Sequence, residues 1–501
     1  MLPLLTAQQI RQADAYTIAN EPISSVDLME RASKAFVGWF VNHFPDKKQG
    51  IAVYCGTGNN GGDGLAIARI LFEHGYVNLN VKVARYAEKT TPDFDVNLQR
   101  LQKSAINILE LLPGVDFAGE TASVIIDALL GSGLNKPLKG DYERLAKFIN
   151  SLSANVVAVD IPTGFFADGE ITPDATVIKA DVVITFQQPK INFLLPESAP
   201  YIHCWKAVNI GLDEKFTNSL NSPYQFVEEK DAKAIIKPRT QFSNKGTYGH
   251  ALIIAGEPET MGAALLSASA CLFTGAGLTT ACIPQSGLVA LNSAQPEIMA
   301  IIREENQAPK IDWDKYNAIG IGPGLGKKDN ALKLLAETLE HFNKPIVVDA
   351  DALNLLAETP HLLNKLPAGS VLTPHMKEFD RLFGQHANWW QRMQTASAKA
   401  AELNINIILK NDYTLIATAK GRVYFNSTGN PAMATGGMGD VLTGIVTSLL
   451  AQKYQPEDAC ILGVYIHGKA GDDLALPNRA NVVMPTQVIQ RLPATMSKLM
   501  A

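Results

Sequence analysis

The chain has 501 residues, of which 47% are hydrophobic and 19% are charged, and its formal net charge is −5. This balance is typical of a globular protein and argues against nucleic acid or an anionic membrane as a partner. No apolar run reaches the about 18 residues that span a bilayer, and the first residues do not resemble a secretion signal. The five cysteines are widely spaced and form no CxxC motif, which indicates reduced thiols. We therefore expect a soluble, cytoplasmic protein of two to three domains, at about 150 residues per domain.

The first half of the chain alternates apolar runs with helical patterns. Helical spacing is present at 29–44 and 64–75. Continuous β-branched runs predict buried strands of a parallel sheet at 51–55, 79–84, 123–129, 155–162 and 181–186. Polar and turn residues dominate from 211 to 245. We place a domain boundary near residue 225, with an error of about ten residues.

The same alternation begins again after this boundary. Strands are predicted at 251–256, 318–322, 345–350, 369–374, 406–409, 414–419 and 422–426. Two helical stretches follow, at 439–451 and 457–475. Each half is therefore predicted to be a three-layer αβα domain, with its functional loops at the carboxyl ends of the strands.

A glycine-rich turn, GTGNNGGDG, follows the first predicted strand and opens a helix. It fits the GxGxxG dinucleotide fingerprint, which is a weak signal on its own. That fingerprint expects an acidic residue roughly 20 positions later, where Arg85 stands instead. Because an arginine side chain can bind a 2′-phosphate, an ordinary NADP-binding site is an alternative interpretation of this turn. Asp63 argues against an NADP site, since its carboxylate would repel a pyrophosphate. The side-chain oxygens of Asn59, Asn60 and Asp63 instead suit sugar hydroxyls or a hard cation.

Two more aspartates stand at the ends of predicted strands. Asp127 leads into a second glycine-rich loop that carries Lys136, and Asp160 leads into a turn with Thr163. The carboxyl ends of parallel strands face one crevice, where ligands bind. Either aspartate alone could simply cap a turn. Their repetition beside glycine-rich loops favours a ligand site.

The stretches GTGNNGGDGLAIAR, IDALLGSGLNKPLKG and AVDIPTG closely resemble the NAD(P)H-hydrate epimerase family, and the resemblance covers residues 1–220. It implies a Rossmann-like domain in which Asp160 contacts the substrate, and we take Asp160 as the candidate acid or base at nicotinamide C6. It also implies a potassium ion bound by Asn60, Asp127 and Thr163, whose oxygen atoms suit such a cation. The implied contacts to the damaged dinucleotide are Asn59, Asn60, Gly61, Gly62, Asp63, Gly131, Ser132, Gly133, Leu134, Asn135, Lys136 and Pro137.

The strongest motif of the second half is NPAMATGGMGDVLTG, in which three glycines precede Asp440 at the start of a helix. Backbone N–H groups at such a helix end can hold a transferring phosphoryl group, and the carboxylate can accept the proton of an attacking hydroxyl. The chain contains no GxxxxGK[ST] motif, which argues against a P-loop enzyme. The ordinary alternative is a glycine-rich turn in which Asp440 only favours the helix dipole.

Other segments support the chemical interpretation of this motif. A glycine-rich loop follows the strand at 318–322, His375 and Glu378 follow the strand at 369–374, and Lys410 and Thr414 lie in a hairpin-like connection. With NKGTYGHALIIAG and VVDADALN, they resemble the ribokinase-like NAD(P)H-hydrate dehydratases, and we assign residues 225–501 to that domain. The resemblance implies substrate contacts by Ala263, Gly324, His375 and Asp440, with Asp440 as the catalytic base. It implies that ADP or ATP, with Mg²⁺, is held by Lys410, Asn411, Asp412, Tyr413, Thr414, Gly436, Gly437 and Gly439.

The two resemblances together predict one chain with two activities. The first domain would interconvert the R and S forms of the hydrated cofactors NADHX and NADPHX. The second would dehydrate the S form by phosphorylating its C6 hydroxyl and eliminating phosphate, with ADP favoured as the donor. Two alternatives stay open: a small-alcohol kinase of the vitamin-precursor type, and a fused non-catalytic domain that senses NADP through Arg85. A homo-oligomer is compatible with the sequence but is not indicated by it.

Overall fold

The computed structural model describes residues 1–117, 119–304, 309–477 and 479–501. The chain divides into two units, of which residues 3–222 form the first, and residues 1–2 together with 223–501 form the second. The predicted boundary near residue 225 lies close to this division. Among the described residues no helix is long and apolar enough to cross a membrane.

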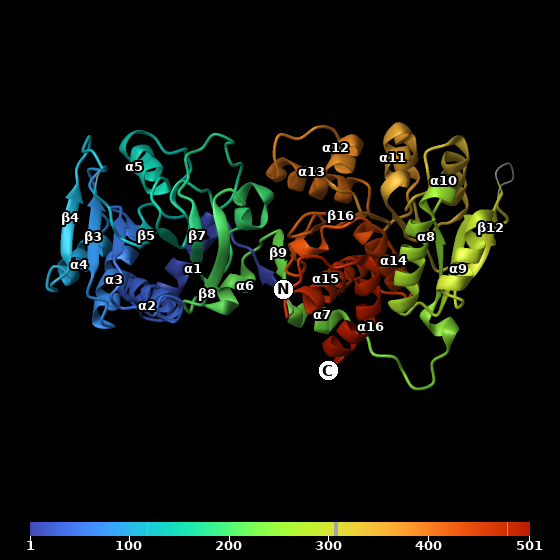
Figure 1. The fold of residues 1–501 in the computed structure, drawn as a ribbon, viewed down its shortest axis with the longest axis horizontal. Coiled ribbons are helices and arrows are strands. Elements are labelled where there is room, and N and C mark those ends of the chain that lie inside the picture. The colour runs from blue at the N-terminus through green and yellow to red at the C-terminus, as the bar shows by residue number, and fades with distance from the viewer. Residues whose placement is uncertain (118, 305–308, 478) are drawn as a thin grey trace. The chain divides into compact units, whose positions relative to one another are not determined.

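The first unit is built on a parallel sheet that has seven strands in the described part of the chain (Figure 1). In sheet order the strands are β4 (Asn107–Leu111), β3 (Leu79–Ala84), β2 (Ile51–Cys55), β5 (Val124–Ala128), β6 (Asn155–Val159), β7 (Ala180–Phe186) and β8 (Ile202–Val208). The helices are α1 (Ala7–Asn20), α2 (Ser25–His43), α3 (Asn59–Glu73), α4 (Pro92–Leu101), α5 (Gly140–Asn150) and α6 (Glu214–Ser219).

Helices cover both faces of this sheet. Successive residues of a strand point to opposite faces, so Ile51 and Val53 join a core with α2, α3 and α4, whereas Ala52 and Tyr54 join a core with α5. The predicted three-layer α/β class is therefore confirmed for this unit. A smaller hydrophobic cluster, separate from both, attaches α1; its buried members are Leu5, Ala13, Leu28, Ala32, Ile210 and Leu212.

The second unit contains a larger mixed sheet, of eleven strands within the described ranges. In sheet order they are β1 (Leu2–Pro3), β9 (Tyr224–Val227), β18 (Val423–Asn426), β17 (Leu415–Ala417), β16 (Asn406–Leu409), β15 (Val371–Leu372), β14 (Ile346–Val348), β13 (Ala318–Ile321), β10 (His250–Ile254), β11 (Leu278–Pro284) and β12 (Met299–Arg303). Strand β17 runs antiparallel to both β16 and β18, which confirms the predicted hairpin-like connection after Lys410.

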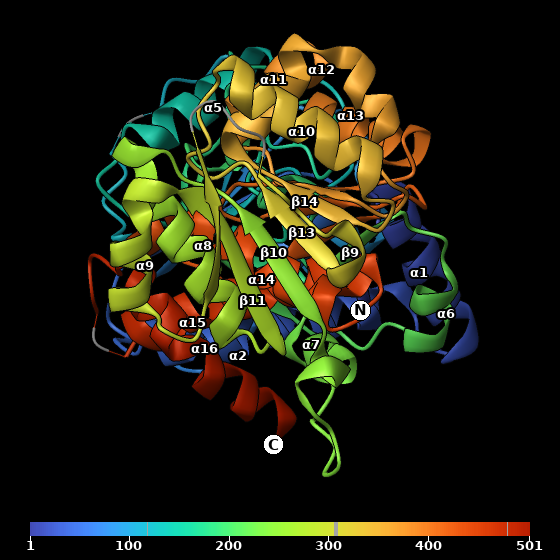
Figure 2. The same cartoon turned by 90° about the vertical axis from the view of Figure 1, so that its right-hand side faces the viewer.

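Helices also form two layers around the second sheet. They are α7 (Glu229–Ile235), α8 (Met261–Phe273), α9 (Leu288–Ala294), α10 (Asp329–His341), α11 (Ala350–Glu358), α12 (Met376–Phe383), α13 (Trp389–Glu402), α14 (Met438–Ala451), α15 (Pro456–Ala475) and α16 (Pro485–Met500). Figure 2 shows α10 to α13 on one face and α8, α14, α15 and α16 on the other. This second α/β unit agrees with the predicted fold class.

Helices α8 and α14 pack closely because Gly444 has no side chain. A Cβ atom at Gly444 would lie 2.1 Å from the backbone oxygen of Ser267. We expect Gly444→Ala to lower the free energy of unfolding by about 1–3 kcal/mol, which is the usual range for overpacking, in urea denaturation of the full chain. Gly262→Ala on α8 is the matched control, because its Cβ would meet no atom within 4 Å. Equal losses in the two variants would show that Gly444 does not limit this helix contact.

Candidate active sites

The first unit has a cleft of about 450 Å³ at the carboxyl edge of its sheet. The neighbouring strands β2, β5, β6 and β7 are followed by Asn60, Gly131, Asp160 and Lys190 respectively, and all four residues line the cleft. Helix α1 contributes a further wall. The remaining lining residues are Ile10, Arg11, Asp14, Gly58, Asn59, Asp63, Leu129, Leu130, Ser132, Gly133, Leu134, Phe186, Gln187, Ile210 and Leu212.

Residues 59–63 form the first turn of α3, with Gly58 as its N-cap, so the helix begins five residues before the helical spacing predicted at 64–75. The turn is tight: a Cβ at Gly61 would lie 1.9 Å from the backbone oxygen of Gly56. Asn60 is buried, and its side-chain nitrogen has no hydrogen-bond partner among the described residues. Because buried polar groups are nearly always paired, this amide is available to a bound ligand.

Asp127 and Thr163 do not line the cleft but are in direct contact with each other. The Asp127 carboxylate accepts hydrogen bonds from the Thr163 backbone N–H at 2.8 Å and from its hydroxyl at 2.7 Å. A third hydrogen bond comes from the Leu129 N–H at 3.2 Å. Burial raises the pKa of Asp127 to about 6, although these three hydrogen bonds oppose the shift. Within the described residues, no ion pair compensates its charge.

Asp160 is held in a special conformation where β6 ends. Its φ angle is +63°, and the strand predicted at 155–162 stops at Val159. Lys190 lies 2.7 Å from its carboxylate, and the Lys190 side chain is only 1% exposed. The Phe186 N–H and the Thr185 hydroxyl also donate to the carboxylate, at 2.9 and 3.2 Å. The sequence analysis missed Lys190, because no local pattern marks a buried lysine.

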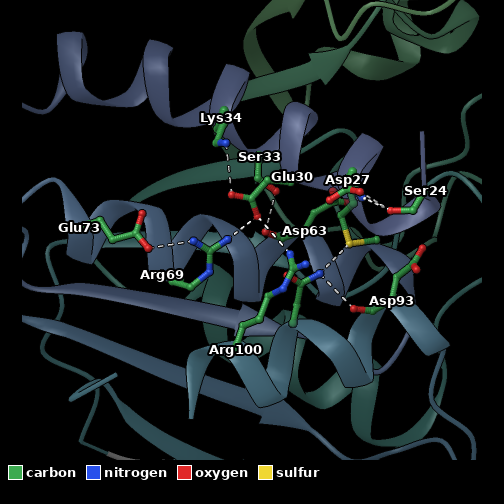
Figure 3. A network of polar contacts seen from close by, with 12 residues as sticks. Ser24, Asp27, Glu30, Ser33, Lys34, Asp63, Arg69, Glu73, Asp93 and Arg100 are labelled. Carbon is green, nitrogen blue, oxygen red and sulfur yellow. Dashed lines mark hydrogen bonds and ion pairs between the residues drawn. The ribbon is translucent and has the colours of Figure 1, made fainter. Parts of the chain in front are cut away.

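Asp63 lines the same cleft and is buried. Burial, with the charges of Asp160, Asp14 and Asp93, raises the pKa of Asp63 well above its ordinary value. The raised pKa disfavours the charged carboxylate, which weakens the repulsion of a pyrophosphate that we inferred from sequence. Figure 3 shows the polar contacts between α2, α3 and α4 around it, in which Glu30 lies 3.6 Å from the Arg100 guanidinium.

Several residues predicted for this site lie outside the lining set. Gly61 and Gly62 are packed inside α3, and Asn135, Lys136 and Pro137 are exposed on the loop that follows Leu134. Arg85 does not line the cleft either. Its guanidinium donates two hydrogen bonds to Glu110, at 2.8 and 3.0 Å. Because Arg85 is paired with Glu110 and lies outside the cleft lining, the structure does not support recognition of an NADP 2′-phosphate by Arg85.

Four neighbouring parallel strands of the second unit, β13 to β16, end at one edge of the sheet. They are followed by Gly322, Asp349, His375 and Lys410. His375 and Lys410 pair in an isolated β-bridge. A Cβ at Gly322 would lie 1.9 Å from the Asp349 backbone oxygen, and the φ of Gly322 is +125°. This edge therefore brings together two of the predicted residues, His375 and Lys410.

Asp440 lies in the first turn of α14, after the left-handed N-cap Gly437 (φ +97°). Burial and the Asp349 carboxylate raise the pKa of Asp440 to about 7; Lys410 opposes this and Asp351 adds to it. A carboxylate with such a pKa can take a proton from a hydroxyl at neutral pH and release it again. The geometry is therefore suited to a general base next to a row of helix N-terminal amides.

Asp349 links the elements on either side of Asp440. It lies 3.0 Å from the Lys410 ammonium and accepts a hydrogen bond from the Thr443 hydroxyl at 2.8 Å. A Cβ at Gly439 would lie 3.3 Å from the Lys410 nitrogen, so this glycine leaves room for the ion pair. The sequence analysis did not assign Asp349 a role. The sequence does contain a signal for Asp349, because this aspartate directly follows an apolar strand, as Asp160 does.

The remaining predicted residues lie around this edge. His375 is the N-cap of α12, and its Nδ1 accepts the backbone N–H groups of Lys377 and Glu378. This geometry places the proton of the neutral ring on Nε2. In the hairpin after β16, both polar side-chain atoms of Asn411 are buried and without a partner among the described residues, whereas Asp412 is exposed. Ala263 lies in the first turn of α8.

The fold and the two candidate sites define a two-unit α/β chain with polar and charged residues gathered at the carboxyl edge of each sheet. Two family models match the chain: "YjeF-related protein N-terminus" over residues 25–192 and "NAD(P)H-hydrate dehydratase" over residues 251–494. The chain belongs to the family of bifunctional NAD(P)H-hydrate repair enzymes. The member from Coxiella burnetii is 34% identical over 98% of this chain and 99% of its own length. The member from Moorella thermoacetica is 33% identical over 99% and 97%.

One solved structure provides a further comparison. The ADP/ATP-dependent NAD(P)H-hydrate dehydratase from Bacillus subtilis, co-crystallised with ATP and Mg²⁺, is 29% identical. It covers 55% of this chain and 98% of its own, with a TM-score of 0.48.

Proposed function

We propose that this chain repairs hydrated NADH and NADPH in two steps. The first unit interconverts the R and S epimers of NADHX and NADPHX, and the second dehydrates the S epimer to NAD(P)H. One observation carries the proposal: full-length relatives are bifunctional repair enzymes, and each unit of this chain has its own carboxylate site. The kinase and NADP-sensing alternatives are not favoured. All five cysteines are free, which fits action in the reducing cytoplasm.

In the first unit, Asp160 acts on the substrate and Asn60, Asp127 and Thr163 hold a potassium ion. The donor set fits this ion, because it consists of an amide, a carboxylate and a hydroxyl oxygen. Asp127 is also fully buried and takes part in no ion pair within the described ranges. A bound cation would supply the missing compensating charge. Of the two predicted segments, Asn59, Asn60, Asp63 and residues 131–134 line the cleft, and these contact the dinucleotide.

In the second unit, Asp440 takes the proton of the C6 hydroxyl as that oxygen attacks the terminal phosphoryl group of ADP or ATP. The amides at Gly436, Gly437 and Gly439 stabilise the transferring group, and Mg²⁺ accompanies the nucleotide phosphates. The phosphorylated C6 oxygen then leaves, and loss of a proton from C5 restores the C5–C6 double bond. Ala263, Gly324 and His375 position the substrate.

Residues 410–414 hold the nucleotide. Asn411 fits this role because its side-chain amide is buried without a partner in the described structure. Lys410 adds a positive charge next to the transferring phosphoryl group. Its ion pair with Asp349 fixes its direction.

The test is incubation of the full chain with a mixture of R and S hydrate and ADP, ATP or neither, followed by the absorbance of reduced nicotinamide. Complete recovery with one nucleotide, and none without, is expected. Recovery that stops at the S fraction would reject the epimerase assignment. A phosphorylated small alcohol that accumulates without any recovery would support the kinase alternative instead.

A further inference from the structure

Inversion at C6 requires two proton transfers within one cleft. The hydroxyl must leave as water, which requires a proton donor, and a water molecule must add to the opposite face, which requires a proton acceptor. Asp160 can supply only one of these two groups, so a second group is needed. The cleft offers two other carboxyl groups, Asp14 from α1 and Asp63 from α3.

Asp160 has the contacts of an acceptor. The Lys190 ammonium lies 2.7 Å away, and two further donors, the Phe186 N–H and the Thr185 hydroxyl, reach the same carboxylate. Lys190 is buried, so its charge is compensated chiefly by Asp160. In all three contacts the Asp160 carboxylate is the accepting group.

Asp14 lies on a different wall and in a different setting. It is partly buried in α1, lines the cleft, and no hydrogen bond or ion pair joins its carboxyl group to another described residue. Its hydrogen-bonding capacity is therefore available to a ligand. The charged or titratable groups that face it are Asp160, Lys190 and Asp63, with Arg11 on its own helix.

The charge environment separates the two candidate donors. Burial and the Asp160 charge raise the pKa of Asp14 to about 6, against the opposing charge of Lys190. An acid is most effective when its pKa lies near the working pH. Asp63 is more deeply buried than Asp14, and burial with the charges of Asp160, Asp14 and Asp93 raises its pKa well above its ordinary value, so Asp14 is the better matched donor.

We propose that Asp14 is the general acid of the epimerase site and that Asp160 is its base. Asp14 gives its proton to the C6 hydroxyl, the C6–O bond breaks, and its electron pair leaves with the water. The N1 lone pair forms a C6=N1 bond. A water then adds to the opposite face of C6, the electron pair of that bond returns to N1, and Asp160 takes the proton of the added water. Solvent water carries the proton from Asp160 back to Asp14, so the net change is inversion alone.

The inference rests on the proposed epimerase function and is tested with Asp14→Asn in the full chain. We expect consumption of the R epimer to fall by about 100-fold or more, the usual share of a general acid. Dehydration of the S epimer should be unchanged. After subtraction of the spontaneous rate, kcat/KM of the wild type for the R epimer should decrease as pH rises through about 6. This decrease should be absent in the variant.

Asp14→Glu keeps a carboxyl group. It should therefore recover part of the rate of R-epimer consumption, and that rate should again depend on pH. Asp95→Asn is the matched control, because Asp95 is exposed and lies outside the cleft. Asp14→Asn with an R-epimer rate and pH profile like those of the wild type would overturn the assignment. If Asp14→Asn does not fold, an Asp14→Glu variant with both the full R-epimer rate and the pH profile of the wild type would overturn it. A wild-type chain that leaves the R epimer untouched would instead reject the epimerase function itself.

Discussion

Replacement of Asp440 by asparagine is expected to abolish recovery of NADH from the S epimer, with a loss of about 100- to 10,000-fold. Asparagine keeps the size of the side chain but cannot accept the proton of the C6 hydroxyl. Lys410 remains paired with Asp349, 3.0 Å away, so the local charge pattern around the nucleotide survives. The measurement is the rise in absorbance of reduced nicotinamide from purified S hydrate and nucleotide.

Interconversion of the R and S epimers should continue in Asp440→Asn, since the first unit has its own site. In the wild type, kcat/KM for dehydration should rise as pH increases through about 7, because the pKa of Asp440 is raised to that value and only the ionised form is a base. Glu229→Gln is a matched control, because Glu229 is an exposed acid in the first turn of α7. A near-normal dehydratase rate in Asp440→Asn would remove Asp440 from the chemistry.

Asp160→Asn should leave the R epimer unconsumed beyond its spontaneous rate, while the S epimer is still dehydrated. Asparagine tolerates the left-handed backbone at this position, so the loop can keep its shape. The variant removes the partner of the buried Lys190 and should lower the free energy of unfolding by about 3–5 kcal/mol. Chromatographic separation of the remaining epimers measures the first effect, and urea denaturation measures the second.

The double variant Asp160→Asn/Lys190→Met separates these two effects. Methionine removes the unpaired charge and nearly preserves the volume of the lysine stem, so most of the lost stability should return. Epimerisation should still be absent. R hydrate that disappears at the wild-type rate in either variant would show that Asp160 is not needed.

The strands that sequence predicted are those with continuous apolar runs, because they are buried on both faces. The strands β1, β4, β8 and β12 were missed, and each lies at an edge of its sheet. An edge strand is partly exposed, so its residues mix polar and apolar types and the run is interrupted. Strands β9 and β11 lie inside the sheet but were also missed: β9 falls in the polar stretch 211–245, and Thr279 and Thr280 interrupt the apolar run of β11.

The aspartates at strand ends could be predicted because the end of a parallel strand is a local sequence feature. The roles of Asp14 and Lys190 could not be predicted from sequence, because they depend on partners that only the fold brings close. Lys190 is buried only since Asp160 lies beside it, 30 residues away in sequence. Asp14 reaches the cleft because the small cluster around Ala13 holds α1 there.

This small cluster separates two tasks within the first unit. The cores on either face of the sheet determine whether the unit folds, and they position Asn60 and Asp160. The cluster around Ala13 determines where α1 places Asp14. Conservative changes among its few side chains can therefore shift one reacting group by fractions of an ångström while the sheet is left alone. The position of the proposed acid can thus be adjusted by substitutions that leave both cores of the sheet intact.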